Sequence, residues 1–202
     1  MEEIIAHIVQ PVSWIDVIIS ACTLFISVVA VIISINTYRS QKEHNKNSVR
    51  PILNIVLGDY EDDLYVRIDN NGVGPAIVSG IHCTCSYFDD LLSANSLVEL
   101  IPYKATVKGE GSGRTADMHT FTDFVEDITG RTIPPGGHIT LLRIAEPKEA
   151  QLLAFRNLLS KCRVEIKYTD IYNSKLWECG RLLDFFGRNP IPDTLHIRYC
   201  KE

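Results

Sequence analysis

The sequence predicts a single N-terminal transmembrane α-helix followed by a mostly-β domain. Three observations lead to this fold class. Residues 17–38 contain no formally charged side chain, and about 20 helical residues cross the roughly 30 Å hydrocarbon core of a bilayer. Beyond residue 51 apolar and polar residues alternate with a period of two, which is typical of half-buried strands. Clusters of Gly, Pro, Asn and Asp separate these segments, as expected for turns.

We expect four segments along the 202 residues. Residues 1–13 form a short periplasmic or interfacial segment, and residues 14–38 form the transmembrane helix. Residues 39–50 form a basic cytoplasmic linker, and residues 51–202 form the cytoplasmic β domain. The last boundary follows from Pro51, because the residue before a proline is driven out of helical geometry.

The residues that flank the apolar segment set its expected orientation. Trp14 and Tyr38 bracket the segment where amphipathic rings prefer to sit, at the two headgroup layers. Residues 1–10 lack the basic start and cleavage site of a signal peptide, so the helix should remain as an anchor. Residues 4–9 have apolar helical spacing, which fits either an interfacial helix or an extension of the main helix. The positive-inside rule places the C-terminal domain in the cytoplasm on four residues: Arg39, Lys42, Lys46 and Arg50.

Charge and cysteine content narrow the class of protein further. The net charge of −5 gives no general attraction to nucleic acid, so no direct nucleic-acid binding is expected. Of the six cysteines, Cys22 lies in the apolar helix and five remain in the domain. An odd number cannot all pair internally, which favours free thiols in a reducing compartment.

The polar residues of the helix fall on one heptad frame. Ser13 and Asp16 begin the two series of this frame, and every Ser and Thr between residues 13 and 37 belongs to it. Small side chains let helices approach closely and hydroxyls hydrogen-bond across interfaces, so the frame predicts a homo-oligomer. Within the span the frame contains Ser20, Thr23, Ser27, Ala30, Ser34 and Thr37.

Three interpretations of this hydroxyl stripe remain open. The helices can form a closed bundle that only assembles the protein. They can instead form a wider ring in which the stripe lines a water path. In the third interpretation each hydroxyl bonds the carbonyl four residues earlier in a lone anchor.

The domain beyond Pro51 is predicted to be a sandwich or barrel with one or two inserted helices. Alternation marks strands over residues 64–69, 81–87, 163–168 and 195–199. One helix is expected near residues 115–128, with Met118, Phe121, Val125 and Ile128 on one side. A second helix should follow Pro147, with Leu152, Phe155 and Leu159 facing inward.

Four sequence elements carry a resemblance: RPILNI, NNGVGPA, IPPGGHITL and VEIKYTDIYNSKLW. Their order is similar to that of small bacterial membrane proteins in which one or two spans precede an immunoglobulin-like β-sandwich. Proteins of this design recur among the transmembrane effectors of antiviral, retron-type defence systems. The resemblance implies an inner-membrane protein that is toxic on triggering. It also implies a regulatory partner, such as a reverse transcriptase with its RNA-DNA product or another defence sensor.

The titratable residues do not predict an enzyme. The glycine-rich stretch 109–114 lacks the Lys-Ser/Thr ending of a P-loop and fits a mobile loop better. His119, Asp123 and Asp127 would share a helix face, where a solvated acidic surface is the simpler interpretation. His82, Cys83 and Cys85 alternate across a strand, and no CxxC, HExxH or GxSxG motif is present. We therefore expect no catalytic residue, metal or cofactor.

Two functions follow as hypotheses. The first is a membrane effector of bacterial antiviral (abortive-infection) defence that oligomerises through its helix and disrupts the inner membrane when triggered. The second is a membrane-tethered binding module that recruits a cytoplasmic partner without permeabilising the membrane.

Overall fold

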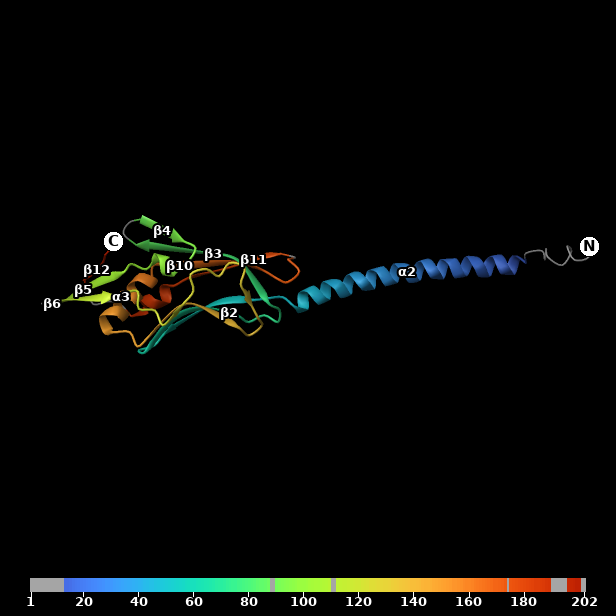
Figure 1. Ribbon diagram of the computed structural model, residues 1–202. Helices are drawn as coiled ribbons and strands as arrows, with labels where there is room; N and C mark the ends of the chain where they lie inside the picture. The colour runs from blue at the N-terminus through green and yellow to red at the C-terminus, as the bar shows by residue number, and fades with distance from the viewer. Residues whose placement is uncertain (1–12, 88–89, 110–111, 174, 190–195, 201–202) are drawn as a thin grey trace, which may run out of the picture. The chain divides into compact units, whose positions relative to one another are not determined.

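The computed structural model describes residues 13–87, 90–109, 112–173, 175–189 and 196–200. The chain divides into two units, one ending at Asn47 and one beginning at Ser48. Figure 1 shows the helices and strands with the labels used below. Apart from Ser13, the segment expected to be interfacial lies outside the described residues.

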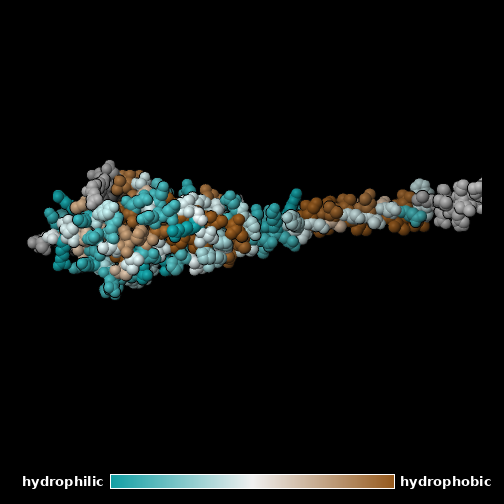
Figure 2. All heavy atoms as spheres, viewed as in Figure 1, coloured by the Kyte–Doolittle hydropathy of each residue, from teal (hydrophilic) through white to brown (hydrophobic). Residues whose placement is uncertain are grey.

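Helix α2 (Trp14–Ser48) makes up the described part of the first unit. It is long and apolar enough to span a membrane, as predicted, and its apolar stretch is not buried inside the protein. Figure 2 shows apolar residues along most of this helix. Phe25, for example, is 70% exposed. An apolar surface of this kind is stable in lipid, where the helix satisfies its own backbone hydrogen bonds.

Local interactions and residue preferences explain where α2 begins and ends. At the start the backbone N–H of Ile15 donates to Ser13 Oγ (3.3 Å), and that of Ser13 donates to Asp16 Oδ2 (3.3 Å). These two side-chain acceptors cap the start of the helix and satisfy two free N–H groups. The predicted linker continues the helix as far as Ser48, because its Arg, Lys, Gln and Glu residues favour helix.

The described residues of the second unit form three β-sheets. The first sheet has the order β1-β2-β9-β7, from β1 (Leu53–Asp59), β2 (Asp63–Asn70), β9 (His138–Ala145) and β7 (Asp123–Phe124). The second has the order β11-β10-β3-β4, from β11 (Leu176–Leu182), β10 (Cys162–Thr169), β3 (Ala76–Tyr87) and β4 (Asp90–Ala94), and β8 (Thr132–Ile133) pairs with β3. The third has the order β12-β5-β6, from β12 (His196–Cys200), β5 (Lys104–Gly109) and β6 (Ser112–Asp117).

The sheets enclose one apolar core, which makes the unit a β-sandwich. In β2 every second residue is buried, and Leu64, Val66 and Ile68 are fully buried. In β10 the same alternation buries Val164 and Ile166. These residues belong to a single buried cluster. The period-two pattern therefore predicted strands β2, β3, β10 and β12 correctly.

One of the two expected helices is confirmed. Helix α3 (Glu149–Leu159) begins soon after Pro147 and buries Phe155 and Leu159, as its apolar spacing predicts. Short 3₁₀ helices occur at η1 (Val98–Leu100) and η2 (Asp184–Arg188).

The helix predicted over residues 115–128 is wrong. Strand β6 occupies its first part and pairs with β5, and the short strand β7 pairs with β9. Met118, Val125 and Ile128 are buried from an extended and irregular chain. Their apolar spacing resembles that of a helix, but pairing with non-local strands overrides the local preference. Of the glycine-rich stretch, Gly109 accordingly ends β5, and residues 112–114 begin β6, which pairs with β5.

Asn70, at the end of β2, is fully buried and links three parts of the sandwich. Its amide Nδ2 donates to the carbonyls of Gly74 (2.8 Å) and Ile133 (3.0 Å). Its Oδ1 accepts from the backbone N–H groups of Gly72 (3.0 Å) and Ile52 (3.2 Å). The side chain thus joins the chain before β1, the corner after β2 and strand β8.

The same corner explains why glycines are needed in the NNGVGPA element and how this element contacts the PPGG element. A Cβ on Gly74 would overlap the carbonyl oxygen of Val49, and one on Gly72 would overlap the backbone N of Ile52. The Asn70 backbone N–H donates to Gly137 O (2.9 Å), within the second motif. The NNGVGPA and PPGG elements therefore bind each other.

Replacing Asn70 by Ala should destabilise the sandwich. The substitution leaves buried N–H and C=O groups without partners, so we expect the free energy of unfolding to fall by about 3 kcal/mol. Chemical denaturation of the detergent-solubilised chain, followed by circular dichroism, measures this change. The control is Asn71→Ala, because the Asn71 side chain is exposed and its loss should cost at most about 0.5 kcal/mol. Equal effects of the two variants would contradict the role of the Asn70 amide.

Candidate functional site

The predicted hydroxyl stripe lies on α2, and its hydroxyls bond their own helix. Each of four hydroxyls donates to the carbonyl four residues earlier, which uses its hydrogen within the helix. Each oxygen keeps a lone pair that can accept a further hydrogen bond. The four bonds are Ser20 Oγ to Asp16 O (2.8 Å), Thr23 Oγ1 to Ile19 O (2.8 Å), Ser27 Oγ to Thr23 O (2.7 Å) and Ser34 Oγ to Ala30 O (2.8 Å).

These bonds change what the stripe can do. A hydroxyl that donates within its own helix presents mainly a small side chain and an acceptor to a neighbouring helix. Close packing of Ser, Thr and Ala then contributes more to association than new hydrogen bonds. Ala30 and Thr37 lie on the same frame and are exposed, so the seam continues towards the C-terminal end of the helix.

Five of the six residues expected to anchor or orient the helix lie on α2. Trp14 and Tyr38 are exposed on α2. Arg39, Lys42 and Lys46 lie on the C-terminal turns of α2. Arg50 differs from the other basic residues, because its guanidinium lies over the ring of Trp177 in the β unit, 5.8 Å from the ring centroid. Arg50 therefore also contributes a cation–π contact to the sandwich.

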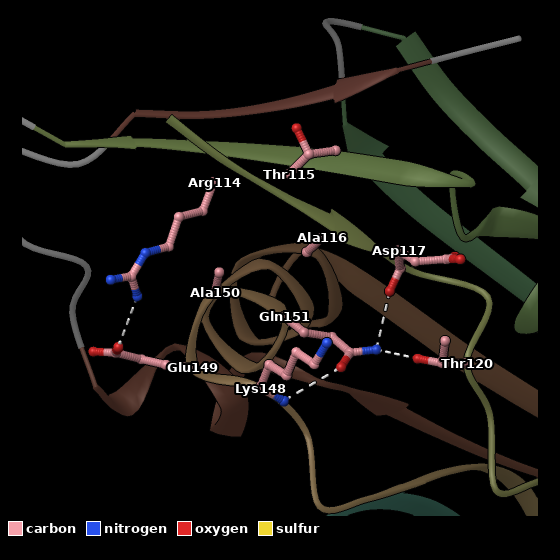
Figure 3. A pocket seen from close by; sticks show the side chains of 9 residues that line it. All are labelled: Arg114, Thr115, Ala116, Asp117, Thr120, Lys148, Glu149, Ala150 and Gln151. Carbon is pink, nitrogen blue, oxygen red and sulfur yellow. Dashed lines mark hydrogen bonds and ion pairs between the residues drawn. The ribbon is translucent and has the colours of Figure 1, made fainter. Parts of the chain in front are cut away.

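A cavity of about 540 Å³ separates β6 from the start of α3 (Figure 3). Gln151 crosses it: Nε2 donates to Asp117 O (3.0 Å) and to the Thr120 hydroxyl, and Oε1 accepts from the backbone N–H of Lys148 (3.4 Å). The amide holds the first turn of α3 against the chain that follows β6. This arrangement was not predicted from the sequence, because residues 115–128 were assigned to a helix.

Two of the four charged residues that line this cavity form an ion pair. Arg114 Nη1 and Glu149 Oε2 lie 3.4 Å apart, and both side chains are largely exposed. An exposed pair of this kind is screened by water and contributes little to stability. The bonds of Gln151 and the Arg114–Glu149 pair thus make this cavity a junction between β6, the chain after it and α3.

His119, Asp123 and Asp127 do not form the shared acidic face that a helix would have given. Asp123 is in β7, and the Asp127 carboxylate accepts from the backbone N–H of Thr129 (2.8 Å), which lowers the pKa of Asp127. His119 instead stacks on Tyr103, with ring centroids 4.2 Å apart. It belongs to a second cavity, which is lined largely by aromatic side chains.

Three of the five cysteines of the domain lie in the core. Cys83, Cys85 and Cys162 are buried, whereas His82 is exposed on the opposite face of β3, as the alternation predicts. Cys162 donates to Cys85 Sγ (2.8 Å), which lowers the pKa of Cys85 and raises that of Cys162. Across the part of the chain that the structure describes, no three His, Cys, Asp or Glu side chains are grouped so that they could hold a metal.

The buried ion pair of Asp59 was not predicted from the sequence. Its carboxylate is fully buried and accepts from Arg156 Nη2 (2.8 Å) and Nε (2.9 Å). Arg188 Nη2 donates to the backbone carbonyl of Asp59 (2.7 Å). These contacts tie the end of β1 to α3 and η2. A lone Asp at a strand end carries no sequence signal of such distant partners.

The core thiols should resist alkylation in the folded protein. Burial raises the pKa of Cys83 to about 12, so at about pH 8 the residue is a protonated and unreactive thiol. Cys200 is exposed and should react faster than Cys83 by about two orders of magnitude. Iodoacetamide labelling with peptide mass spectrometry measures both rates, and labelling in denaturant serves as the control. Equal rates in the native protein would contradict the buried position of Cys83.

Comparison with protein families identifies a match to a family model. A family model described as "Domain of unknown function (DUF8453)" matches residues 13–185. The matched region includes α2, most of the sandwich and the buried corner at Asn70. No curated protein matches the chain. Because the match extends over most of the sequence, from α2 into η2, the chain belongs to the DUF8453 family.

Proposed function

We propose that this protein is an inner-membrane effector of bacterial antiviral defence, whose helices associate through the hydroxyl stripe and disrupt the membrane when triggered. In this proposal α2 spans the membrane with the N-terminus outside, and the sandwich lies in the cytoplasm. The observation that most supports this proposal is the surface of α2. It presents one seam of small side chains and is apolar on its other faces. The resemblance to retron-type effectors supplies the biological setting.

The physical basis of association is the contrast between the two faces of α2. Ile18, Phe25 and Ile32 are large and exposed on the face opposite the seam, where they suit lipid chains. Ser20 and Ser27 allow a second helix to approach closely on the other face. Lipid cannot fill a narrow seam as well as another helix does, so self-association is favoured there.

In this proposal the sandwich regulates the activity of the membrane helix. Its first residues, from Val49 to Ile52, are held by the Asn70 corner. A regulatory partner that binds the sandwich can therefore act on the segment that enters the membrane helix. By the resemblance, the partner is a reverse transcriptase with its RNA-DNA product or another defence sensor.

A second candidate function is a membrane-tethered binding module with no permeabilising role. The observation that favours it is the set of hydrogen bonds from Ser20, Thr23, Ser27 and Ser34 to their own helix. A helix that satisfies its hydroxyls internally needs no partner helix. The sandwich would then recruit a cytoplasmic protein to the membrane.

Triple substitutions on the two faces of α2 test the proposal. Replacing Ser20, Ser27 and Ser34 by Leu fills the seam and should abolish toxicity and membrane depolarisation while the protein still inserts. Replacing the same serines by Ala keeps the seam narrow: activity should persist if packing matters and disappear if the hydroxyls line a water path. The control is leucine at Ile18, Phe25 and Ile32, which should leave activity unchanged. A potential-sensitive dye and viable counts in induced cells measure these effects.

Two results would contradict the effector function. One is normal membrane potential and viability in cells that express the protein without its partner genes or with the trigger present. The other is equal activity of the seam and control variants. Recruitment of a cytoplasmic protein by the Leu variant of the seam, without toxicity in any variant, would instead support the tethered binding module.

A further inference from the structure

The second cavity of the sandwich has a volume of about 620 Å³ and shares no lining residue with the Gln151 cavity. A volume of this size is within the range of ligand sites, about 300–1,000 Å³. Its walls come from η1 and the residues after it, from the chain that follows β6, and from β7 and the residues after it. The lining residues are mainly aromatic and acidic.

The aromatic wall is a continuous series of ring contacts. Tyr103 stacks on His119 with an interplanar angle of 11°. Phe121 then contacts both His119 (5.3 Å between centroids) and Phe124 (5.4 Å). Phe121 also meets the fully buried Phe155 of α3 edge-on at 6.3 Å. The wall is therefore anchored in the core, although Tyr103 and Phe124 remain about half exposed.

Two hydrogen bonds fix the centre of this wall. His119 Nε2 lies 2.9 Å from the carbonyl oxygen of Ile101, and the backbone N–H of His119 donates to Asp117 Oδ1 (3.0 Å). These bonds hold the imidazole against Tyr103. A ring surface that is ordered before binding loses little conformational entropy when a ligand arrives.

The formal charge around the cavity is negative. Glu99 and Glu126 line it, and no Lys or Arg does. Both glutamates are exposed. Within the described ranges, neither of them forms an ion pair. Their carboxylates therefore remain available to a ligand, beside ring faces whose electron density also attracts positive charge.

We propose that this cavity binds an organic cation, an alkylammonium or guanidinium group held between the aromatic wall and the carboxylates of Glu99 and Glu126. The ring faces of Tyr103 and Phe124 contact the apolar and cationic parts of the ligand, and the carboxylates balance its charge. The group belongs either to a free small molecule or to a Lys or Arg side chain of a partner protein. This binding depends on the sandwich alone and does not rest on the membrane function proposed above.

Calorimetric titration of the full chain in detergent micelles tests the proposal. The probes are choline, spermidine, acetyl-lysine amide, acetyl-arginine amide and a short peptide containing Lys and Arg. The neutral control is 3,3-dimethylbutanol, which has the shape of choline without its charge. We expect saturable binding of at least one cation at constant ionic strength and no binding of the neutral analogue. Tighter binding of the amides and peptide identifies a protein side chain as the ligand, and tighter binding of choline or spermidine identifies a free cation.

Variants of the lining residues give the second measurement. The double substitution Glu99→Gln and Glu126→Gln should weaken binding by about tenfold, because it removes both charges but keeps the shape. Tyr103→Ala should weaken binding several-fold through the lost ring face. Glu149→Gln, at the other cavity, is the matched control and should bind as the wild type does. No binding of any cation at millimolar concentration, equal binding of the neutral analogue, or unchanged affinity of the double variant would overturn the proposal.

Discussion

The buried amide of Asn70 is the interaction on which the sandwich most depends. Its donors and acceptor reach the chain before β1, the corner after β2 and strand β8 of the other sheet. A buried amide is costly unless every polar atom has a partner, and here each one does. The glycines at positions 72 and 74 leave room for the entering backbone. One side chain therefore connects two sheets and also fixes the first residues of the domain.

Helix α2 follows a different physical rule, because its apolar stretch is not buried inside the protein and is long enough to span a bilayer. In that environment the exposed Ile, Leu and Phe side chains cost nothing, whereas an unbonded hydroxyl would be expensive. The serines meet this requirement through the carbonyls of their own helix. The seam is therefore defined by small side chains rather than by unsatisfied donors. A narrow seam of this kind favours association by close van der Waals packing rather than by a network of hydrogen bonds between helices.

The parts of the fold that could be predicted from sequence are those with a local signal. The uncharged stretch predicted the long apolar helix α2, and alternation predicted β2, β3, β10 and β12. Residues 115–128 could not be predicted, because Met118, Val125 and Ile128 are buried from a chain held by distant strands. The aromatic cavity was missed for the same reason, since Tyr103, His119 and Phe124 meet only after β5, β6 and β7 find their partners. The Asp59–Arg156 pair likewise joins residues far apart in the sequence.

Membrane topology is the property on which the functional account rests, and Cys200 offers a direct way to measure it. This thiol is exposed at the end of β12. A membrane-impermeant maleimide applied to spheroplasts, before and after permeabilisation, reports the side on which the sandwich lies, with Cys200→Ser as the background control. A cytoplasmic sandwich predicts Cys200-dependent labelling only after permeabilisation. Full labelling of intact spheroplasts, or extraction of the protein from membranes by alkaline carbonate, would contradict a spanning helix with a cytoplasmic domain.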